Sequence, residues 1–212
     1  MKSSNLVLIN VLVILLIVAG GGAAVYYYMQ SVNYISTDNA RVDGQAVSIA
    51  APADGVLSDW TGAVGQTFTP GQRVGAVRTP AGTTNITASV KGTVVQQSAV
   101  VGSIVGAGTP LARTYDLDSL WVTANIKETR IRDVKADQVV DVYVDAYPGT
   151  TLTGKISQIG LATAGTFSLL PASNTSSNYT KVTQVIPVTV TIDNYRGVGL
   201  LPGMNARIRI HK

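Results

Sequence analysis

Few side chains in this sequence could carry acid–base, nucleophilic or metal chemistry. The chain has no Cys, one His (His211, next to last) and one Glu (Glu128), which excludes a disulfide scaffold, a zinc site built on Cys and a cysteine nucleophile. Among the aspartates, Asp116 and Asp118 form the closest pair, with no His, Glu or third carboxylate near them in the sequence. They favour a turn stabilised through its own backbone over a metal site. We therefore predict that the protein is not an enzyme and has no catalytic residue, cofactor or metal.

The composition is that of a folded protein with a weak positive charge. Hydrophobic residues make up 46% of the 212 residues and charged residues 13%, which is enough apolar material for one or two small domains. The formal net charge is +4, and no run of Lys and Arg is longer than two residues. These features exclude a disordered protein and argue against nucleic acid as a partner.

The first element that the sequence predicts is a membrane anchor over residues 1–30, a transmembrane helix. Residues 6–25 contain one polar residue, Asn10, and no charge, and a helix of twenty residues is about 30 Å long, the thickness of the bilayer core. Three consecutive tyrosines follow, as in the aromatic belt at a membrane interface: Tyr26, Tyr27 and Tyr28. The alternative is a signal peptide that is cleaved near residues 22–25.

An internal repeat occupies the middle of the chain. Three glycines recur at one constant offset of thirty-seven residues: Gly55, Gly65 and Gly71 with Gly92, Gly102 and Gly108. Apolar positions recur at the same offset: Leu57 with Val94, Val64 with Val101, Phe68 with Val105, and Val74 with Leu111. Each half is typical of short strands joined by tight turns, where a positive φ or a close backbone contact requires glycine. Two halves that cover each other's apolar face predict a β-sandwich over residues 46–115, the alternative being a generic glycine-rich β-domain.

The spacing of this repeat resembles the biotinyl/lipoyl type of domain. Carrier domains of that type attach their cofactor to a Lys at the turn between the two halves. Residues 78–87, which join the halves here, contain no Lys, and Lys91 lies inside the second half. The resemblance therefore implies a lipoyl-like sandwich that carries no cofactor.

Residues 116–212 predict an antiparallel β-barrel. Period-two alternation, β-branched residues and Pro-Gly turns mark its strands, over residues 120–126, 139–144, 152–159, 185–192 and 206–210. Residues 127–135 predict one short helix, with Ile131 and Val134 directed toward the barrel. Residues 31–45 predict a strand after the anchor that joins the barrel region.

Several motifs, taken in order, resemble the membrane fusion (efflux adaptor) proteins of the HlyD/EmrA type. They are residues 36–42, the barrel opening at residues 116–129, residues 167–174, residues 178–188, and the Leu-Pro-Gly-Met turn at residues 201–204. The resemblance covers the chain in the order anchor, half-lipoyl, half-lipoyl, barrel. It implies a mainly β fold and a non-catalytic adaptor of a drug efflux or secretion system. It further implies a membrane transporter of the major-facilitator type as partner, and assembly into a homo-oligomer.

The sequence departs from this family between the two lipoyl halves. Family members from double-membrane bacteria carry a long α-helical hairpin there, whereas this chain has about ten residues that include Pro80 and Gly82. Pro and Gly disfavour a helix, ten extended residues cover at most about 35 Å, and no heptad pattern occurs in the chain. We therefore expect a short form that works near its own membrane, as in a single-membrane cell.

A candidate partner-docking loop covers residues 161–181. It interrupts two strand patterns and is long for a connection without secondary structure, as functional loops often are. Its candidate docking residues are Phe167, Leu169, Leu170 and Pro171, an apolar group in a polar surrounding. The alternative is that these residues fold back and close the end of the barrel.

Two functions from different classes follow from these features. The first is an adaptor in the cell membrane that crosses the bilayer once, with a cytoplasmic N-terminus and the bulk of the chain outside, where it docks on the transporter. The second is a cell-surface or cell-wall binding module that has no transporter partner.

Overall fold

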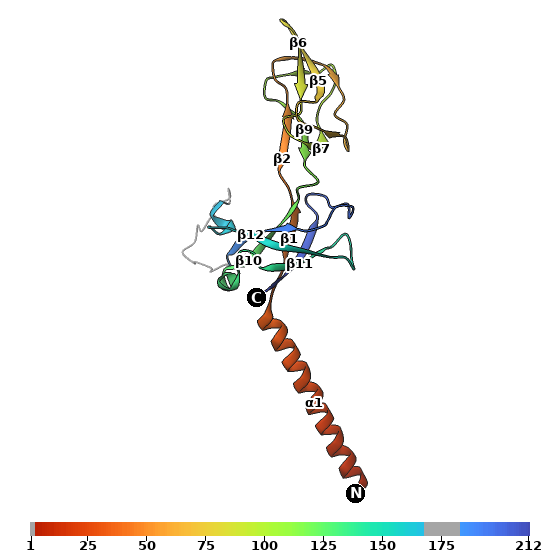
Figure 1. The fold of residues 1–212 in the computed structure, drawn as a ribbon, viewed down its shortest axis with the longest axis vertical. Coiled ribbons are helices and arrows are strands. Elements are labelled where there is room, and N and C mark those ends of the chain that lie inside the picture. The colour runs from red at the N-terminus through yellow and green to blue at the C-terminus, as the bar shows by residue number, and fades with distance from the viewer. Residues whose placement is uncertain (1–2, 168–182) are drawn as a thin grey trace, which may run out of the picture.

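The computed structural model describes residues 3–167 and 183–212 of an elongated molecule. Helix α1 forms one end, a β-barrel lies in the middle, and a β-sandwich forms the other end (Figure 1). Residues 1–2 and 168–182 lie outside the described part of the chain. The chain is mainly β and combines a sandwich with a barrel, as predicted.

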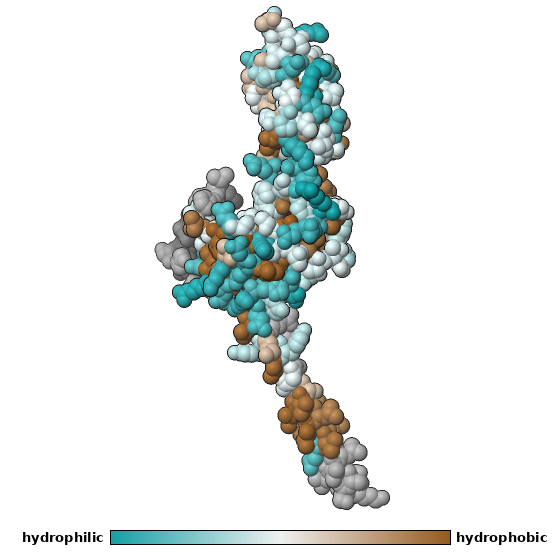
Figure 2. All heavy atoms as spheres, viewed as in Figure 1, coloured by the Kyte–Doolittle hydropathy of each residue, from teal (hydrophilic) through white to brown (hydrophobic). Residues whose placement is uncertain are grey.

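Helix α1 (Ser3–Asn33) contains the predicted apolar stretch and extends beyond it at both ends. No Pro and no charged residue interrupts it, so every residue is compatible with the helical hydrogen-bond ladder. Its large apolar side chains at residues 11–18 are 45–68% exposed, and Figure 2 shows them as an apolar arm below the barrel. Within the described residues, however, no helix combines the length and the hydropathy that crossing a membrane requires. The predicted transmembrane helix is therefore not supported.

The β-sandwich consists of two four-stranded antiparallel sheets, ordered β2-β9-β7-β4 and β6-β5-β3-β8. Their strands are β2 (Ala46–Ala50), β3 (Gly55–Trp60), β4 (Thr67–Phe68), β5 (Arg73–Thr79), β6 (Gly82–Thr87), β7 (Gly92–Gln97), β8 (Ile104–Val105) and β9 (Pro110–Tyr115). Strands β3 and β4 recur as β7 and β8 at the offset of thirty-seven residues, and β2 and β5 recur as β6 and β9 to within one residue. The repeat therefore extends one strand further toward the N-terminus than the glycines indicate.

The two halves of the repeat exchange strands. Each sheet contains two strands of each half, because β2 and β4 of the first half pair with β9 and β7, and β6 and β8 of the second half pair with β5 and β3. Equivalent hydrogen bonds run in both directions: the Gly65 N–H donates to the Val94 carbonyl (2.8 Å), and the Gly102 N–H donates to the Leu57 carbonyl (2.7 Å). Two intact halves that face each other, as expected from the sequence, are thus too simple a description.

One apolar core lies between the two sheets. It contains three of the four recurring apolar pairs: Leu57 with Val94, Phe68 with Val105, and Val74 with Leu111. The fourth pair, Val64 and Val101, is 63% and 58% exposed. The repeat therefore builds the core from both halves and also places an apolar side chain on the surface of each.

The second β-unit is a closed antiparallel barrel in the order β1-β10-β13-β12-β11-β14. Its strands are β1 (Tyr34–Asp43), β10 (Trp121–Lys127), β11 (Val139–Val144), β12 (Thr151–Ile159), β13 (Val185–Ile192) and β14 (Asn205–His211). Side chains alternate between the core and the surface, as on β10, where Val122, Ala124 and Ile126 are buried. Strand β1 follows α1 directly and closes the barrel by pairing with β10 and β14.

Two short 3₁₀ helices, η1 (Glu128–Asp133) and η2 (Ala164–Phe167), connect barrel strands. The helix expected over residues 127–135 is η1, which is shorter and of the 3₁₀ type. Val134 is buried in the barrel core, and Ile131 packs against that core while partly exposed. The expected direction of these two side chains is confirmed.

Candidate functional site: the junction between sandwich and barrel

Two chain segments connect the barrel to the sandwich, and they lie close together. One runs from β1 to β2 through Gly44, and the other runs from β9 to β10 through residues 116–120. A Cβ atom added to Gly44 would lie 2.7 Å from Leu120 Cδ2 and 3.3 Å from Tyr115 Cδ1. A side chain at this position would therefore have to displace the buried side chain of Leu120.

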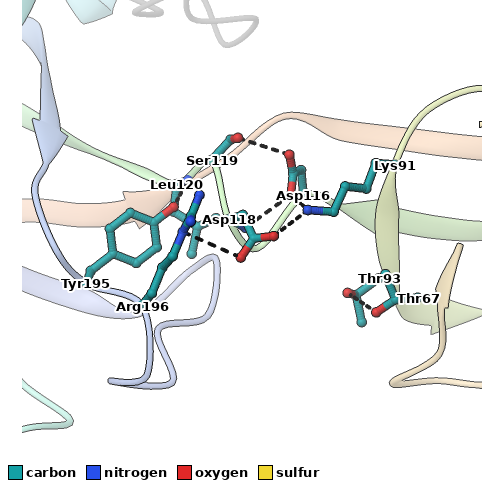
Figure 3. Close-up of polar contacts among 9 residues, drawn as sticks. All are labelled: Thr67, Lys91, Thr93, Asp116, Asp118, Ser119, Leu120, Tyr195 and Arg196. Atoms are coloured by element: carbon teal, nitrogen blue, oxygen red, sulfur yellow. Dashed lines mark hydrogen bonds and ion pairs between the residues drawn. The ribbon is translucent and has the colours of Figure 1, made fainter. Parts of the chain in front are cut away.

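Charged side chains from three parts of the chain meet beside this junction, and we call them the junction cluster: Lys91, Asp116, Asp118 and Arg196. Lys91 precedes β7 in the sandwich, and Arg196 lies between β13 and β14 of the barrel. Figure 3 shows both cations directed at the connecting segment. The Lys91 ammonium donates to Asp118 and lies 3.9 Å from Asp116 Oδ1, while Arg196 Nε lies 3.9 Å from Asp118 Oδ1. The cluster therefore joins the sandwich, the connection and the barrel.

The backbone of the connection is fixed by local hydrogen bonds. The Asp118 N–H donates to Asp116 Oδ1 (3.1 Å), and Ser119 Oγ donates to Asp116 Oδ2 (2.9 Å). The Leu120 N–H donates to the buried hydroxyl of Tyr195 (2.6 Å), as Figure 3 shows. The aspartate pair therefore stabilises a turn and in addition binds both domains.

The junction cluster shifts the titration of its own members. The hydrogen bond from Lys91, together with the positive charge of that side chain, lowers the pKa of Asp118. The same hydrogen bond and the charge of Asp118 raise the pKa of Lys91. Both groups are therefore charged at neutral pH, and the ionic contacts of the cluster are present there.

A cleft of about 590 Å³ also lies at the junction. The sandwich contributes Arg113 and Tyr115 to its wall, and the barrel contributes the turn of Leu201, Pro202 and Gly203. Gly203 has a φ of +91°, and its N–H donates to the Val42 carbonyl (2.8 Å). The turn that the sequence singled out therefore holds β1 and faces the sandwich.

The six glycines of the repeat lie at turns and close contacts of the sandwich. Four have a positive φ, between +81° and +89°, with no atom near the place of a Cβ: Gly65, Gly71, Gly102 and Gly108. A Cβ on Gly55 would lie 2.2 Å from the Arg78 carbonyl oxygen, and one on Gly92 would lie 3.1 Å from the Thr114 side chain. These glycines shape the turns and the close backbone contacts of the domain.

The predicted docking loop lies largely outside the described residues. The backbone of Phe167 ends η2, while Leu169, Leu170 and Pro171 fall within the undescribed residues 168–182. Docking and barrel closure therefore both stay predictions. Of the predicted interface tyrosines, Tyr26 and Tyr28 are 65% and 72% exposed on α1, and the side chain of Tyr27 lies outside the description.

The barrel wall carries a polar cluster that the sequence did not predict. Asp141 accepts hydrogen bonds from Arg209 Nε and Nη2 (3.1 and 2.9 Å), and its Oδ2 lies 3.0 Å from His211 Nε2. Burial raises the pKa of Asp141, but the hydrogen bonds from Arg209 and His211 outweigh burial and lower it. The Arg209 guanidinium also stacks on Tyr34, 4.9 Å from the ring centroid. The alternating pattern Arg207-x-Arg209-x-His211 places three basic side chains on one face of a strand and could have indicated this cluster in the sequence.

These arrangements connect elements that lie far apart in the sequence. Among the described residues, no three His, Cys, Asp or Glu side chains gather to hold a metal ion. The polar side chains that are fully buried in the same residues all have hydrogen-bond partners. The contacts at the junction are suited to fix the orientation of the sandwich relative to the barrel.

The two β-units match two family models. The model described as "YhbJ, barrel-sandwich hybrid domain" matches residues 45–116, and the model described as "CusB-like, beta-barrel domain" matches residues 119–212. The putative efflux system component YhbJ of Bacillus subtilis (strain 168) is 44% identical over 210 residues, which cover 99% of this chain and 94% of that protein.

Other matches cover part of longer proteins or share the fold alone. The multidrug export protein EmrA of Escherichia coli (strain K12) is 34% identical over 111 residues, which cover 52% of this chain and 28% of that protein. The crystal structure of ZneB from Cupriavidus metallidurans has a TM-score of 0.62 at 16% identity, covering 84% of this chain and 98% of that chain. The structure of the periplasmic adaptor protein EmrA has a TM-score of 0.57 at 11% identity, covering 85% of this chain and 99% of that one.

Proposed function

Because the chain belongs to the membrane fusion protein (efflux adaptor) family, as a short form that lacks the α-helical hairpin, we propose that it is a non-catalytic adaptor that docks on the outer face of a membrane transporter. The observation that carries this proposal is the linear order of an apolar helix, a barrel and a sandwich (Figure 1). The same order of sandwich and barrel spans nearly the full length of the relative named as an efflux system component. The domain limits proposed are 1–30, 31–45, 46–115 and 116–212.

The missing hairpin limits how far the adaptor reaches. Strands β5 and β6 are joined by a two-residue turn at Pro80 and Ala81, and Thr79 Oγ1 donates to the Gly82 carbonyl (2.9 Å) across it. The far end of the sandwich is therefore a closed β-hairpin, without a stalk. We place the action of this adaptor close to its own membrane.

Helix α1 supports attachment to a membrane. Apolar side chains exposed on all sides of a helix are unfavourable in water, at about 25 cal/mol per Å² of apolar surface, and favourable in a bilayer. We therefore propose that α1 lies in the membrane with a cytoplasmic N-terminus and that the barrel stands on the outer surface. The transporter that we propose as partner is of the major-facilitator type, as the resemblance to EmrA-type proteins implies.

The sandwich offers a surface for self-association. Val56 and Ile104 are paired across β3 and β8 and are 39% and 87% exposed. Val100 and Val101, in the preceding turn, are 64% and 58% exposed. We call these four residues the valine–isoleucine patch, and we propose that it mediates contact between copies of the chain in a homo-oligomer.

The function is tested by co-purification of the full chain with a candidate transporter encoded beside it, and by drug resistance of a deletion strain. We expect Leu16→Asp to abolish both, because a central Asp costs about 2.5–3.5 kcal/mol in a membrane helix. Leu16→Ile serves as the matched control and retains both.

Full resistance in a strain that produces only a secreted fragment from residue 34 onward would contradict membrane attachment. Unchanged resistance in the deletion strain, with retained binding to cell-wall material, would favour the cell-surface binding module instead.

A further inference from the structure

A cleft of about 1020 Å³ opens in the barrel wall next to helix α1. It forms because β1 and β10 pair only between residues 40–43 and residues 121–124. Closer to α1, Tyr34 to Thr37 pair with β14 alone. The first residues of β1 and the end of β10 with η1 therefore form two walls, which the hydrogen bond from Thr37 Oγ1 to the Asn125 carbonyl (3.0 Å) connects.

The cleft is strongly cationic. Its lining includes four cations and one carboxylate: Lys127, Arg130, Arg207, Arg209 and Asp38. Asp141 already binds Arg209. The other three cations are exposed, and among the described residues none of them forms an ion pair with a carboxylate within 4.0 Å. Of the two carboxylates on η1, Asp133 is bound by Lys212 at 2.8 Å, while Glu128 is exposed and does not line the cleft.

The tyrosines of the cleft hold its cationic wall in place. The Arg209 guanidinium lies 4.9 Å from the ring centroid of Tyr34 and 5.7 Å from that of Tyr143. Ile35, Ile126 and Ile208 form the apolar base. An anion in this cleft would meet unpaired cations at the mouth and a rigid wall behind them.

The cleft lies at the end of the barrel from which α1 departs. Tyr34, in its wall, follows the last residue of α1 directly. From Tyr28 to Asn33 the helix advances about 8 Å, and the headgroup region extends about 5–8 Å beyond the apolar core of a bilayer. Figure 2 shows hydrophilic residues gathered over the part of the barrel next to α1. With Tyr26 to Tyr28 at the interface, the cleft faces the headgroups.

We propose that this cleft binds the phosphate of an anionic phospholipid headgroup through Lys127, Arg130 and Arg207. The inference rests on the membrane attachment proposed above. Charge complementarity and the position beside α1 identify the ligand, because basic side chains near a membrane surface attract anionic lipids. The bound lipid then fixes the rotation and tilt of the barrel against the membrane.

The test uses the full chain in vesicles of phosphatidylcholine to which phosphatidylglycerol is added stepwise. The chain has no Cys, so Thr129→Cys, at a residue that lines the cleft, accepts a single environment-sensitive dye. The triple variant Lys127→Gln, Arg130→Gln, Arg207→Gln is compared with Arg78→Gln, Arg113→Gln, Lys155→Gln, which removes three exposed cations outside the cleft. The single variant Arg130→Gln tests the cleft with the smallest change to the fold.

We expect the cleft variant to need at least about tenfold more phosphatidylglycerol for half of the dye response, since each cation near the surface contributes about a fivefold preference. The control variant shifts by less than about twofold. An equal dye response in vesicles with and without phosphatidylglycerol overturns the inference. Saturation by inorganic phosphate, or by an acidic peptide without anionic lipid, also overturns it, in favour of a free anion or a protein partner.

Flotation of the full chain with the vesicles separates this inference from the proposed function. Flotation with both vesicle compositions and no lipid-specific response contradicts the cleft alone. Failure to float with either composition contradicts membrane attachment and the cleft together.

Discussion

Lys91 and Asp118 show how single charged residues act in this protein. Both side chains are about half exposed, so their ionic contact is screened by water and adds little to the stability of either domain. The contact matters because it connects different parts of the molecule: Lys91 belongs to the sandwich, and Asp118 also lies near Arg196 of the barrel. We therefore expect the junction cluster to restrain the angle between the two domains.

We predict that Asp118→Asn widens the distribution of angles between sandwich and barrel and leaves the Tm of each domain almost unchanged. The amide cannot attract Lys91 and Arg196 as a carboxylate does, but the turn and the Tyr195 hydrogen bond stay. The distance between spin labels on Thr83→Cys and Lys155→Cys measures the effect. Asp59→Asn, which removes an ion pair within the sandwich, is the matched control and leaves the distance distribution as it is.

The same labels test the pH dependence of the cluster. Because the folded protein lowers the pKa of Asp118, the contact is complete above the ordinary Asp pKa of about 3.9 and is lost as the pH falls through the lowered value. Because the pKa of Lys91 is raised, loss on the alkaline side begins only above the ordinary Lys pKa of about 10.4. A distance distribution that changes between pH 5 and pH 9 would contradict the cluster as the restraint.

Turn glycines explain how two sequence halves form one sandwich. Gly71 and Gly108 occupy equivalent turns with φ of +81° and +82°, and their N–H groups donate to Ala88 and Ala51 (both 2.8 Å). Each bond ties one half of the repeat to the other. The turns therefore help to hold the two halves of the repeat together.

We predict that Gly71→Ala and Gly108→Ala each lower the free energy of unfolding of the sandwich by about 1–2 kcal/mol, the cost of a positive φ for an L-residue. The two values are equal because the turns are equivalent and no atom lies near either Cβ position. Denaturation followed by Trp60 fluorescence, in a Trp121→Phe background, reports on the sandwich alone.

Gly106→Ala is the control for these turns. Gly106 has no strained φ, and the nearest atoms lie 3.5 Å or more from the position of an added Cβ. We therefore expect this substitution to change the free energy of unfolding by no more than about 0.5 kcal/mol. A loss in the control as large as in the two turn variants would show that side-chain size, and not backbone conformation, decides stability here.

At the scale of the whole molecule, helix α1 and the valine–isoleucine patch both present exposed apolar side chains. The other half repeats the patch only in part: Val101 has the exposed Val64 as its equivalent, whereas Ile104 and Val56 have Thr67 and Thr93. A contact between this patch and a different surface of the next copy is head-to-tail, the type that forms rings when the rotation closes. Such a ring of short adaptors would surround the outer face of a transporter.

We predict that Ile104→Asp shifts the full chain from oligomer to monomer, because a buried unpaired carboxylate is unfavourable at an apolar interface. Mass measurement by light scattering in detergent detects the shift. Thr67→Asp, which adds the same charge at the equivalent exposed position, leaves the mass unchanged. An Ile104→Asp chain of unchanged mass would remove the patch from the proposed oligomer.

Much of the fold follows from local sequence rules. Glycine spacing at Gly55 to Gly108 predicts the repeat because a missing Cβ has a local cause, either a positive φ or a close contact. Period-two alternation predicts strands such as β11 (Val139–Val144) with their bounds, because successive side chains of a strand point to opposite faces. The family resemblance then predicts the order of the domains.

Tertiary structure alone decided which distant residues meet. Lys91 reaches Asp118 across 27 residues of sequence, and His211 reaches Asp141 across 70, because the pairing of β7 with β9 and of β11 with β14 brings these segments side by side. The cationic cleft likewise exists because β1 and β10 separate after four pairs. The local periodicity of the sequence determines which face of a strand a side chain occupies. The strand order and the register of the folded sheets determine which residues it contacts on that face.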